Sequence, residues 1–153
     1  MNCGAICLQY VHSQHGKKLS LRKARKLCHT TRAGTYNAGL IEALEKLGYK
    51  NPRHKQHIKW WELKRLVDAG NDVFVSWWSD LDSNGTPSLA DGHWSVARKV
   101  TRDTITLFDP DPETEITLPR LAFESRWHDY ESDHAGRKDF IRAAIIARYP
   151  KGK

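Results

Sequence analysis

The chain has 153 residues, a length that usually forms one domain around one sizeable core. Its apolar fraction of 39% and charged fraction of 28% are those of a globular protein, which excludes disordered and fibrous classes. No segment approaches the roughly 20 consecutive apolar residues that cross a bilayer, and the first residues lack the pattern of a secretory signal. We therefore expect one domain over residues 1–153, in the cytoplasm and without a membrane partner.

The cysteines and the charge exclude further classes. Three cysteines, Cys3, Cys7 and Cys28, have neither the even number of a disulfide framework nor the spacing of a metal site. The net charge is +7, and cations gather in two runs, within residues 17–26 and 50–59. These runs leave nucleic-acid binding open as an alternative. Because no nucleic-acid motif accompanies them, we interpret them as solvated surface and expect no nucleic-acid partner.

The first half of the chain has apolar residues at helical spacing and predicts four helices. Ser20 is a suitable N-cap for the second helix, and Gly48 is a suitable terminator for the third. The third helix is expected to open at Gly34 and Thr35. The predicted helices span residues 4–14, 21–28, 34–47 and 60–69.

The second half is richer in β-branched and aromatic residues and predicts strands. Alternation along 93–100 places Trp94, Val96 and Arg98 on one face. The opposite face then carries His93, Ser95, Ala97 and Lys99. Pro119 suits the first position of a short helix. The predicted strands span 72–78, 93–100, 103–109, 115–118 and 140–148, with a helix over 119–127. Helices followed by an antiparallel sheet predict an α+β fold.

Cys3 is the candidate nucleophile. It stands where the first helix begins, and a helix N-terminus favours a thiolate through its unpaired N–H groups and partial positive charge. Gly4 follows it and is expected to leave the sulfur accessible. Cys7 lies one turn later in an apolar neighbourhood, so we interpret it as a core residue.

His93 and Asp109 are the candidate base and orienting residue. His93 begins one predicted strand and Asp109 ends the next, so a hairpin turning near Thr101 would place them opposite each other. Cross-strand partners have Cβ atoms about 5 Å apart, which lets a carboxylate hold one imidazole nitrogen while the other accepts the thiol proton. The remaining histidines lack such a pairing: His12, His15, His29, His54, His57, His128 and His134.

A family resemblance covers nearly the whole chain in order. The run 2–8, Asn-Cys-Gly-Ala-Ile-Cys-Leu, resembles the Asp/Glu-Cys-Gly-x-x-Cys-Leu segment of the bacteriocin-processing cysteine peptidases, which are papain-like domains that cleave leader peptides after a double glycine. Further similar segments follow at the family's spacing. They are 16–27 (glycine, then a Ser-Leu helix), 34–35 with 40–49 (Gly-Thr, helix, Leu-Gly-Tyr), 92–97 (His-aromatic-x-Val), 105–110 (ending Asp-Pro) and 123–127 (Phe to Trp).

The resemblance implies a papain-like cysteine peptidase with Cys3 as nucleophile, His93 as base and Asp109 as orienting residue. It also implies a glutamine several residues before the cysteine as an oxyanion donor, and here only Met1 and Asn2 precede Cys3. The donor would then lie upstream of Met1, or the Asn2 amide or another group would replace it, or turnover would be slow. The chain carries no transporter segment, so we expect a free-standing domain whose substrate need not be a double-glycine leader.

Two other patterns have a functional and a structural interpretation. Asp80, Asp82, Asn84 and Asp91 fit the ligand spacing of a calcium loop, but the flanks read as strands and Pro87 interrupts the pattern. We interpret this segment as a polar connection and predict no metal and no cofactor. The chain also has six tryptophans; most suit a core, and Trp78 or Trp94 is expected to line the substrate groove.

The leading hypothesis is therefore hydrolysis of peptide bonds in a peptide or protein substrate through an acyl-thioester intermediate. A catalytically weak, peptide-binding domain is the second, since the upstream glutamine is missing. Acyl transfer by the same triad is the third, because fold and triad do not fix the acceptor. Substrate, cleavage specificity and oligomeric state do not follow from the sequence.

Overall fold

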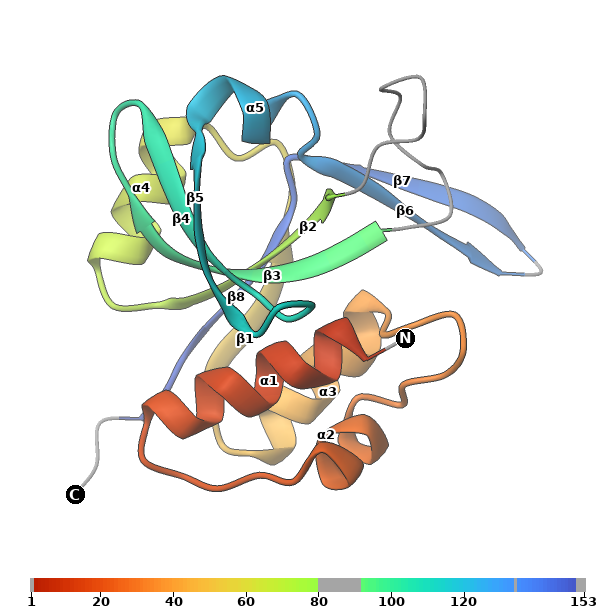
Figure 1. Ribbon diagram of the computed structural model, residues 1–153. Helices are drawn as coiled ribbons and strands as arrows, with labels where there is room; N and C mark the ends of the chain where they lie inside the picture. The colour runs from red at the N-terminus through yellow and green to blue at the C-terminus, as the bar shows by residue number, and fades with distance from the viewer. Residues whose placement is uncertain (1, 80–91, 134, 151–153) are drawn as a thin grey trace.

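The computed structural model describes residues 2–79, 92–133 and 135–150 (Figure 1). Its first half holds four helices and one strand: α1 Cys3–Gln14, α2 Leu21–Leu27, α3 Asn37–Lys46, β1 Lys50–Lys55 and α4 Trp60–Asp68. The second half holds most of the strands: β2 Asp72–Trp78, β3 Gly92–Val100, β4 Thr104–Asp109, β5 Thr114–Pro119, α5 Arg120–Glu124, β6 His128–Asp133, β7 Gly136–Ile141 and β8 Ala144–Arg148.

Helices within the described ranges are all too short or too polar to cross a membrane.

A six-stranded antiparallel sheet forms the centre of the molecule, in the order β1-β8-β2-β3-β4-β5. Helices α1, α2 and α3 lie on one side of it, and α4 and α5 lie on the other (Figure 1). Each side has its own apolar cluster, because residues of the sheet alternate between the two. The predicted α+β fold with helices packed on an antiparallel sheet is confirmed, and the helices cover both faces of the sheet.

The helical stripes read from the sequence form the first of these clusters. Ala24, Leu40, Leu44 and Cys7 are buried there, which confirms the prediction that Cys7 is a core residue. The Ser20 side chain accepts a hydrogen bond from the Lys23 N–H at 3.1 Å, as an N-cap should. The cations of α2 are solvent-exposed on its other face, so this basic run is a solvated helix surface.

A bulge in β3 determines how β3 and β4 align. Val96 pairs with Phe108 and Ala97 with Leu107, but the register shifts by one residue between Ala97 and Lys99. Beyond the bulge, Val100 rather than Lys99 is buried on the Ala97 side, so the simple alternation predicted for Lys99 is wrong. Continued from Val96 and Phe108 to the end of β4, this register sets Asp109 opposite Ser95, two residues from the expected partner His93.

Other boundaries also differ from prediction. The third helix begins at Asn37, because Gly34 has φ 101° in a turn bridged to Thr31. Pro119 ends β5 and caps α5, which stops at Glu124 rather than at 127. The single strand expected over 140–148 is two strands, since Arg142 adopts a left-handed φ of 45° between them.

Three strands were wholly or mostly absent from the sequence prediction. Strand β1 contains Pro52 and several cations, which suggested a loop, but it lies at the edge of the sheet, where proline is tolerated. Strands β6 and β7 form a separate two-stranded hairpin of mostly polar residues, which extends away from the sheet (Figure 1). The candidate calcium ligands Asp80, Asp82, Asn84 and Asp91 lie outside the described residues.

Candidate active site

Helix α1 begins at Cys3, so the thiol stands at a helix N-terminus as predicted. Asn2 is the N-cap residue by position, yet its side chain makes no capping hydrogen bond, and the first turn has no acidic residue. The first N–H groups of the helix are therefore free to face a negative charge near the sulfur. Cys3 is 8% exposed, and its thiol lines a cavity.

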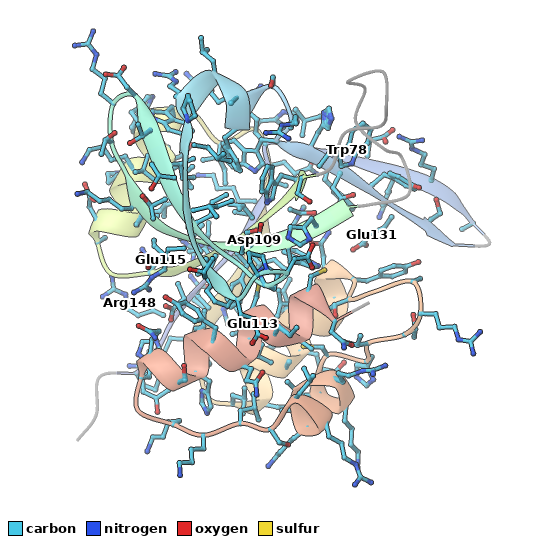
Figure 2. The ribbon with its side chains drawn as sticks, viewed as in Figure 1. Trp78, Asp109, Glu113, Glu115, Glu131 and Arg148 are labelled. Carbon is cyan, nitrogen blue, oxygen red and sulfur yellow. The ribbon has the colours of Figure 1, made fainter. Side chains whose placement is uncertain are left out.

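His93 and Asp109 meet between β3 and β4. The Nε2 atom of His93 lies 2.7 Å from Oδ1 of Asp109, and both side chains are largely buried. Oδ1 also accepts a hydrogen bond from the Asp111 N–H at 3.1 Å, which orients the carboxylate. Figure 2 shows Asp109 between the sheet and α1.

The His93 imidazole also interacts with Cys3. Burial by itself lowers the pKa of His93, but hydrogen bonds to Cys3 and Asp109, together with the charges of both, raise it to about 9. The Trp77 ring packs edge-on against the imidazole with centroids 6.2 Å apart, and its Nε1–H donates to Ser95 at 3.0 Å. The structure thus brings all three predicted catalytic residues together, with the imidazole between a thiol and a carboxylate.

Gly4 has a different role from the expected one. A Cβ at this position would lie 2.6 Å from Cβ of Thr35 and 3.1 Å from Cδ1 of Trp94. The missing side chain therefore lets the first turn of α1 pack closely against Trp94, whose Nε1–H donates to the Thr35 carbonyl at 2.9 Å. Close packing of the helix start, rather than open access to sulfur, explains the glycine.

Asn2 is a candidate oxyanion donor. Its Oδ1 atom is buried and has no hydrogen-bond partner in the part of the chain that the structure describes. The glutamines of α1 lie elsewhere: Gln9 lines a separate surface pocket, and Gln14 accepts a hydrogen bond from Arg98. Of these amides, only the one on Asn2 adjoins Cys3.

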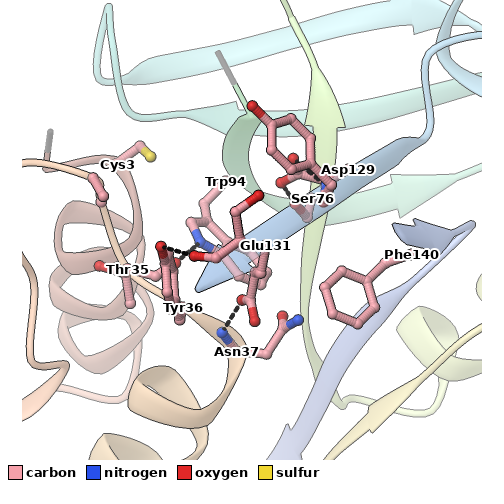
Figure 3. A pocket seen from close by; sticks show the side chains of 13 residues that line it. Cys3, Thr35, Tyr36, Asn37, Ser76, Trp94, Asp129, Glu131 and Phe140 are labelled. Atoms are coloured by element: carbon pink, nitrogen blue, oxygen red, sulfur yellow. Dashed lines mark hydrogen bonds between the residues drawn. The ribbon is translucent and has the colours of Figure 1, made fainter. Parts of the chain in front are cut away.

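A cavity of about 300 Å³ opens beside Cys3 (Figure 3). Its walls come from the loop before α3, from β2 and β3, and from the β6–β7 hairpin. Trp94 is among the residues that line it. Trp78 stands outside this lining and packs on His128 at the base of the hairpin, with ring centroids 4.2 Å apart. The lining residues are Cys3, Ala33, Gly34, Thr35, Tyr36, Asn37, Ser76, Trp94, Asp129, Tyr130, Glu131, Ser132 and Phe140.

The sequence analysis missed the hairpin's contribution to this cavity. Asp129 accepts hydrogen bonds from the Ser76 hydroxyl and from the Tyr130 N–H, the latter at 2.7 Å. Glu131 accepts one from the Asn37 N–H at 2.6 Å, and the Tyr36 hydroxyl donates to the Ser132 carbonyl at 3.0 Å. The strand over 128–133 is hard to recognise in the sequence, because polar residues occupy both of its faces and the usual alternation of apolar with polar residues is lacking.

One group of side chains has the composition of a metal site. Within the described ranges, ligand atoms of His93, Asp109 and Asp111 lie within 4.8 Å of one another. Nε2 of His93 is hydrogen-bonded to Asp109, and this bond accounts for the short separation of the ligand atoms.

Comparison with known proteins agrees with this geometry. Residues 1–131 match the Peptidase C39 family. The transport/processing ATP-binding protein ComA of Streptococcus pneumoniae (strain R6) is 30% identical over 131 residues, a match that covers 83% of this chain and 16% of ComA. The chain thus spans only about a sixth of the length of the curated relatives it matches.

Two solved structures share the fold. The peptidase domain of Streptococcus ComA superposes with a TM-score of 0.68 at 22% identity, covering 97% of this chain and 92% of that domain. A double-glycine-motif protease from an AMS/PCAT transporter, solved with a leader peptide, superposes at 0.65 with 16% identity, covering 97% and 85%. Because the family match covers most of its length, the chain belongs to the Peptidase C39 family of cysteine peptidases.

Proposed function

We propose that this chain hydrolyses peptide bonds with Cys3 as nucleophile, His93 as general base and acid, and Asp109 as orienting residue. The observation that carries the proposal is the placement of one imidazole between a helix-start thiol and a buried carboxylate, with its pKa raised to about 9. At neutral pH this favours an imidazolium, which can give a proton to the leaving amine.

Each residue then has one step to perform. The Cys3 thiolate attacks the scissile carbonyl carbon, forming the C–S bond, while the His93 imidazolium gives its proton to the departing amine as the C–N bond breaks. Water next attacks the thioester, His93 takes a proton from it, and the C–S bond breaks to release the acid and restore the thiolate. Asp109 keeps the ring oriented and stabilises its positive charge throughout.

The oxyanion of each tetrahedral intermediate needs donors. We propose that the Cys3 N–H at the start of α1 supplies one and that the Asn2 amide supplies another. The Asn2 side chain makes no capping hydrogen bond, and its buried Oδ1 has no partner among the described residues, which supports a role other than helix capping. Trp94 lines the same cavity and would contact the substrate chain.

The substrate that the relatives support is a leader peptide. One of the matched structures is a double-glycine-motif protease bound to such a peptide, and the ComA proteins combine processing with transport. We therefore propose a peptide or protein substrate with small residues at the scissile bond, where a side chain would crowd Trp94. We expect no nucleic acid, and we keep the cytoplasm as the compartment, since all three cysteines are free thiols.

A peptide-library digest read by mass spectrometry tests the proposal. We expect cleavages that disappear in Cys3→Ala and His93→Ala but persist in Cys28→Ala, because Cys28 is buried and does not line the cavity. Added amine acceptors separate hydrolysis from acyl transfer, because transfer would yield amide adducts instead of free acids. Absence of cleavage, with peptide still bound by Cys3→Ala and by the unmodified chain alike, would replace the peptidase with a peptide-binding domain.

A further inference from the structure

The cavity beside Cys3 is acidic, although the chain as a whole carries a net charge of +7. Asp129 and Glu131 are alternate residues of β6, so both side chains lie on the same face of the hairpin. Figure 3 shows them across the cavity from Cys3, with Phe140 beyond them. Any group that extends from the thiol into this cavity meets two carboxylates.

The hydrogen-bond donors that hold these carboxylates are neutral. Asp129 is bonded by a hydroxyl and a backbone N–H, and Glu131 by a backbone N–H. Among residues 2–79, 92–133 and 135–150, neither carboxylate forms an ion pair; the charges of His128 near Asp129 and of Lys138, opposite Glu131 on β7, are the weakest influences on their pKa values. No ion pair of these residues therefore balances the negative charge in the cavity.

Burial makes that charge costly. Burial raises the pKa of Asp129 against the opposing effect of its hydrogen bonds. It also raises the pKa of Glu131, and the nearby Asp129 charge adds to the increase. A cation entering the cavity would relieve both effects, because charge pairs are strongest where water is excluded. The aromatic side chains of Tyr36 and Phe140 belong to the same cavity and can contact the apolar stem of a long cationic side chain.

Glu131 has a structural bond, but that bond does not require a charge. Only Oε2 is engaged with the Asn37 N–H, and a glutamine amide oxygen could accept the same bond. A matched carboxylate is available for comparison: Glu45 is exposed on α3 and does not line the cavity.

We propose that Asp129 and Glu131 form a subsite that binds a cationic group of the substrate, an ammonium or a guanidinium, within reach of the Cys3 thiol. The assignment rests on the proposed function, since it places this group on the peptide that Cys3 attacks. It narrows the substrate class to peptides with a lysine, an arginine or a free amino terminus close to the scissile bond.

The first experiment measures the charge preference of the cavity without requiring turnover. Cys3 is modified with three methanethiosulfonates of similar size that carry an ammonium, no charge or a sulfonate, and reaction at Cys3 is followed by mass spectrometry. We expect the ratio of the ammonium reagent's rate to the neutral reagent's rate to be about tenfold higher at Cys3 than at a small free thiol. The doubly substituted Asp129→Asn/Glu131→Gln chain should lose this gain, whereas Glu45→Gln should keep it. Rate ratios equal to those of the free thiol in the unmodified chain would overturn the proposal.

The second experiment uses peptides and separates the subsite from the peptidase. Lysine, norleucine or glutamate is placed at each position around the scissile bond, with free or acetylated amino termini to distinguish the two sources of cation. We expect about tenfold faster cleavage for a cation at one position, lost in the double variant. Cleavage without any charge preference would overturn the subsite and leave the peptidase standing. Absence of cleavage together with a retained reagent preference would overturn the peptidase and support the cation site.

Discussion

His93 and Asp109 are hydrogen-bonded at 2.7 Å although they are not cross-strand partners. The β3–β4 pairing, continued by one residue beyond Val96 and Phe108, would set Asp109 opposite Ser95, so Asp109 reaches the imidazole along the diagonal of the sheet. Diagonal neighbours are about 7–8 Å apart at the backbone, a separation that an imidazole and a carboxylate can bridge. The N–H of Asp111, in the turn after β4, in turn holds the Asp109 carboxylate.

Selective alkylation should identify Cys3 as the reactive thiol. Burial raises the pKa of Cys28 to about 12 and that of Cys7 well above its ordinary value, so both remain protonated near neutral pH. With limiting iodoacetamide at pH 7, we expect Cys3 to react at least about tenfold faster than either, because only the thiolate is nucleophilic. Peptide mapping by mass spectrometry gives the three rates. Equal rates at Cys3 and Cys28 would contradict the activated thiolate.

Activity should decline on the alkaline side near pH 9. The pKa of His93 is raised in the folded chain, so its imidazolium and the associated stabilisation are fully present below the unfolded value of about 6.5 and disappear as pH rises through about 9. The Asp109→Asn substitution removes a charge that stabilises the His93 imidazolium. The pH at which activity falls on the alkaline side should therefore decrease by about one unit. The pH profile of kcat for peptide cleavage provides the measurement. An unchanged alkaline decline in Asp109→Asn would show that the carboxylate does not act on the imidazole.

Asn2→Ala tests the proposed oxyanion donor. Loss of one such donor typically lowers kcat by about 100-fold to 1000-fold with little change in KM. The alkylation rate of Cys3 is the control, because iodoacetamide generates no oxyanion and should react as it does with the unmodified chain. If kcat falls by less than about threefold, the Asn2 amide does not contribute and another donor must be sought.

Gly4→Ala should damage the site through packing. The new methyl group would lie 2.6 Å from Thr35 Cβ, so the start of α1 must shift, at a cost of about 1–3 kcal/mol in the free energy of unfolding. Gly39→Ala is the matched control, because its methyl group would meet the Cys28 carbonyl at 2.2 Å, away from the cavity. Denaturant unfolding should show both losses, while only Gly4→Ala should also slow Cys3 alkylation. A Gly4→Ala chain with normal stability and normal alkylation would exclude this explanation of the glycine.

Arg142→Gly should stabilise the fold. Arg142 has a left-handed φ of 45°, a conformation that costs a non-glycine residue about 1 kcal/mol. Its backbone N–H donates to Trp127 and its carbonyl accepts from Ile58, and glycine preserves both bonds. We expect a gain of about 0.5–1 kcal/mol after the flexibility of glycine in the unfolded chain is subtracted. Arg142→Ala, which keeps the Cβ, should show no gain; equal stabilisation by both substitutions would point to the removed charge.

The sequence sufficed for the features that depend on local pattern. Helical stripes such as Leu40 with Leu44 predicted the packed faces, and the helix start and the paired strands pointed to Cys3, His93 and Asp109, in agreement with the ordered likeness to a family. The details that failed depend on contacts distant in sequence. The β3 bulge places two residues opposite one and cannot be read from alternation, so the His93–Asp109 pair was predicted for the wrong register. The Asp129 and Glu131 carboxylates escaped notice because their role arises only where β6 meets the loop before α3.

The sheet order has a consequence for handling shorter versions of the protein. Strand β8 lies between β1 and β2, although it is the last strand along the chain. The sheet is therefore continuous only in a chain that includes residues 144–148. A fragment that stops at residue 131, where the family match ends, would leave two unpaired strand edges exposed and prone to intermolecular pairing. Expression boundaries chosen from the family match alone should therefore yield aggregates, whereas boundaries beyond Arg148 should yield a chain that folds slowly but completely.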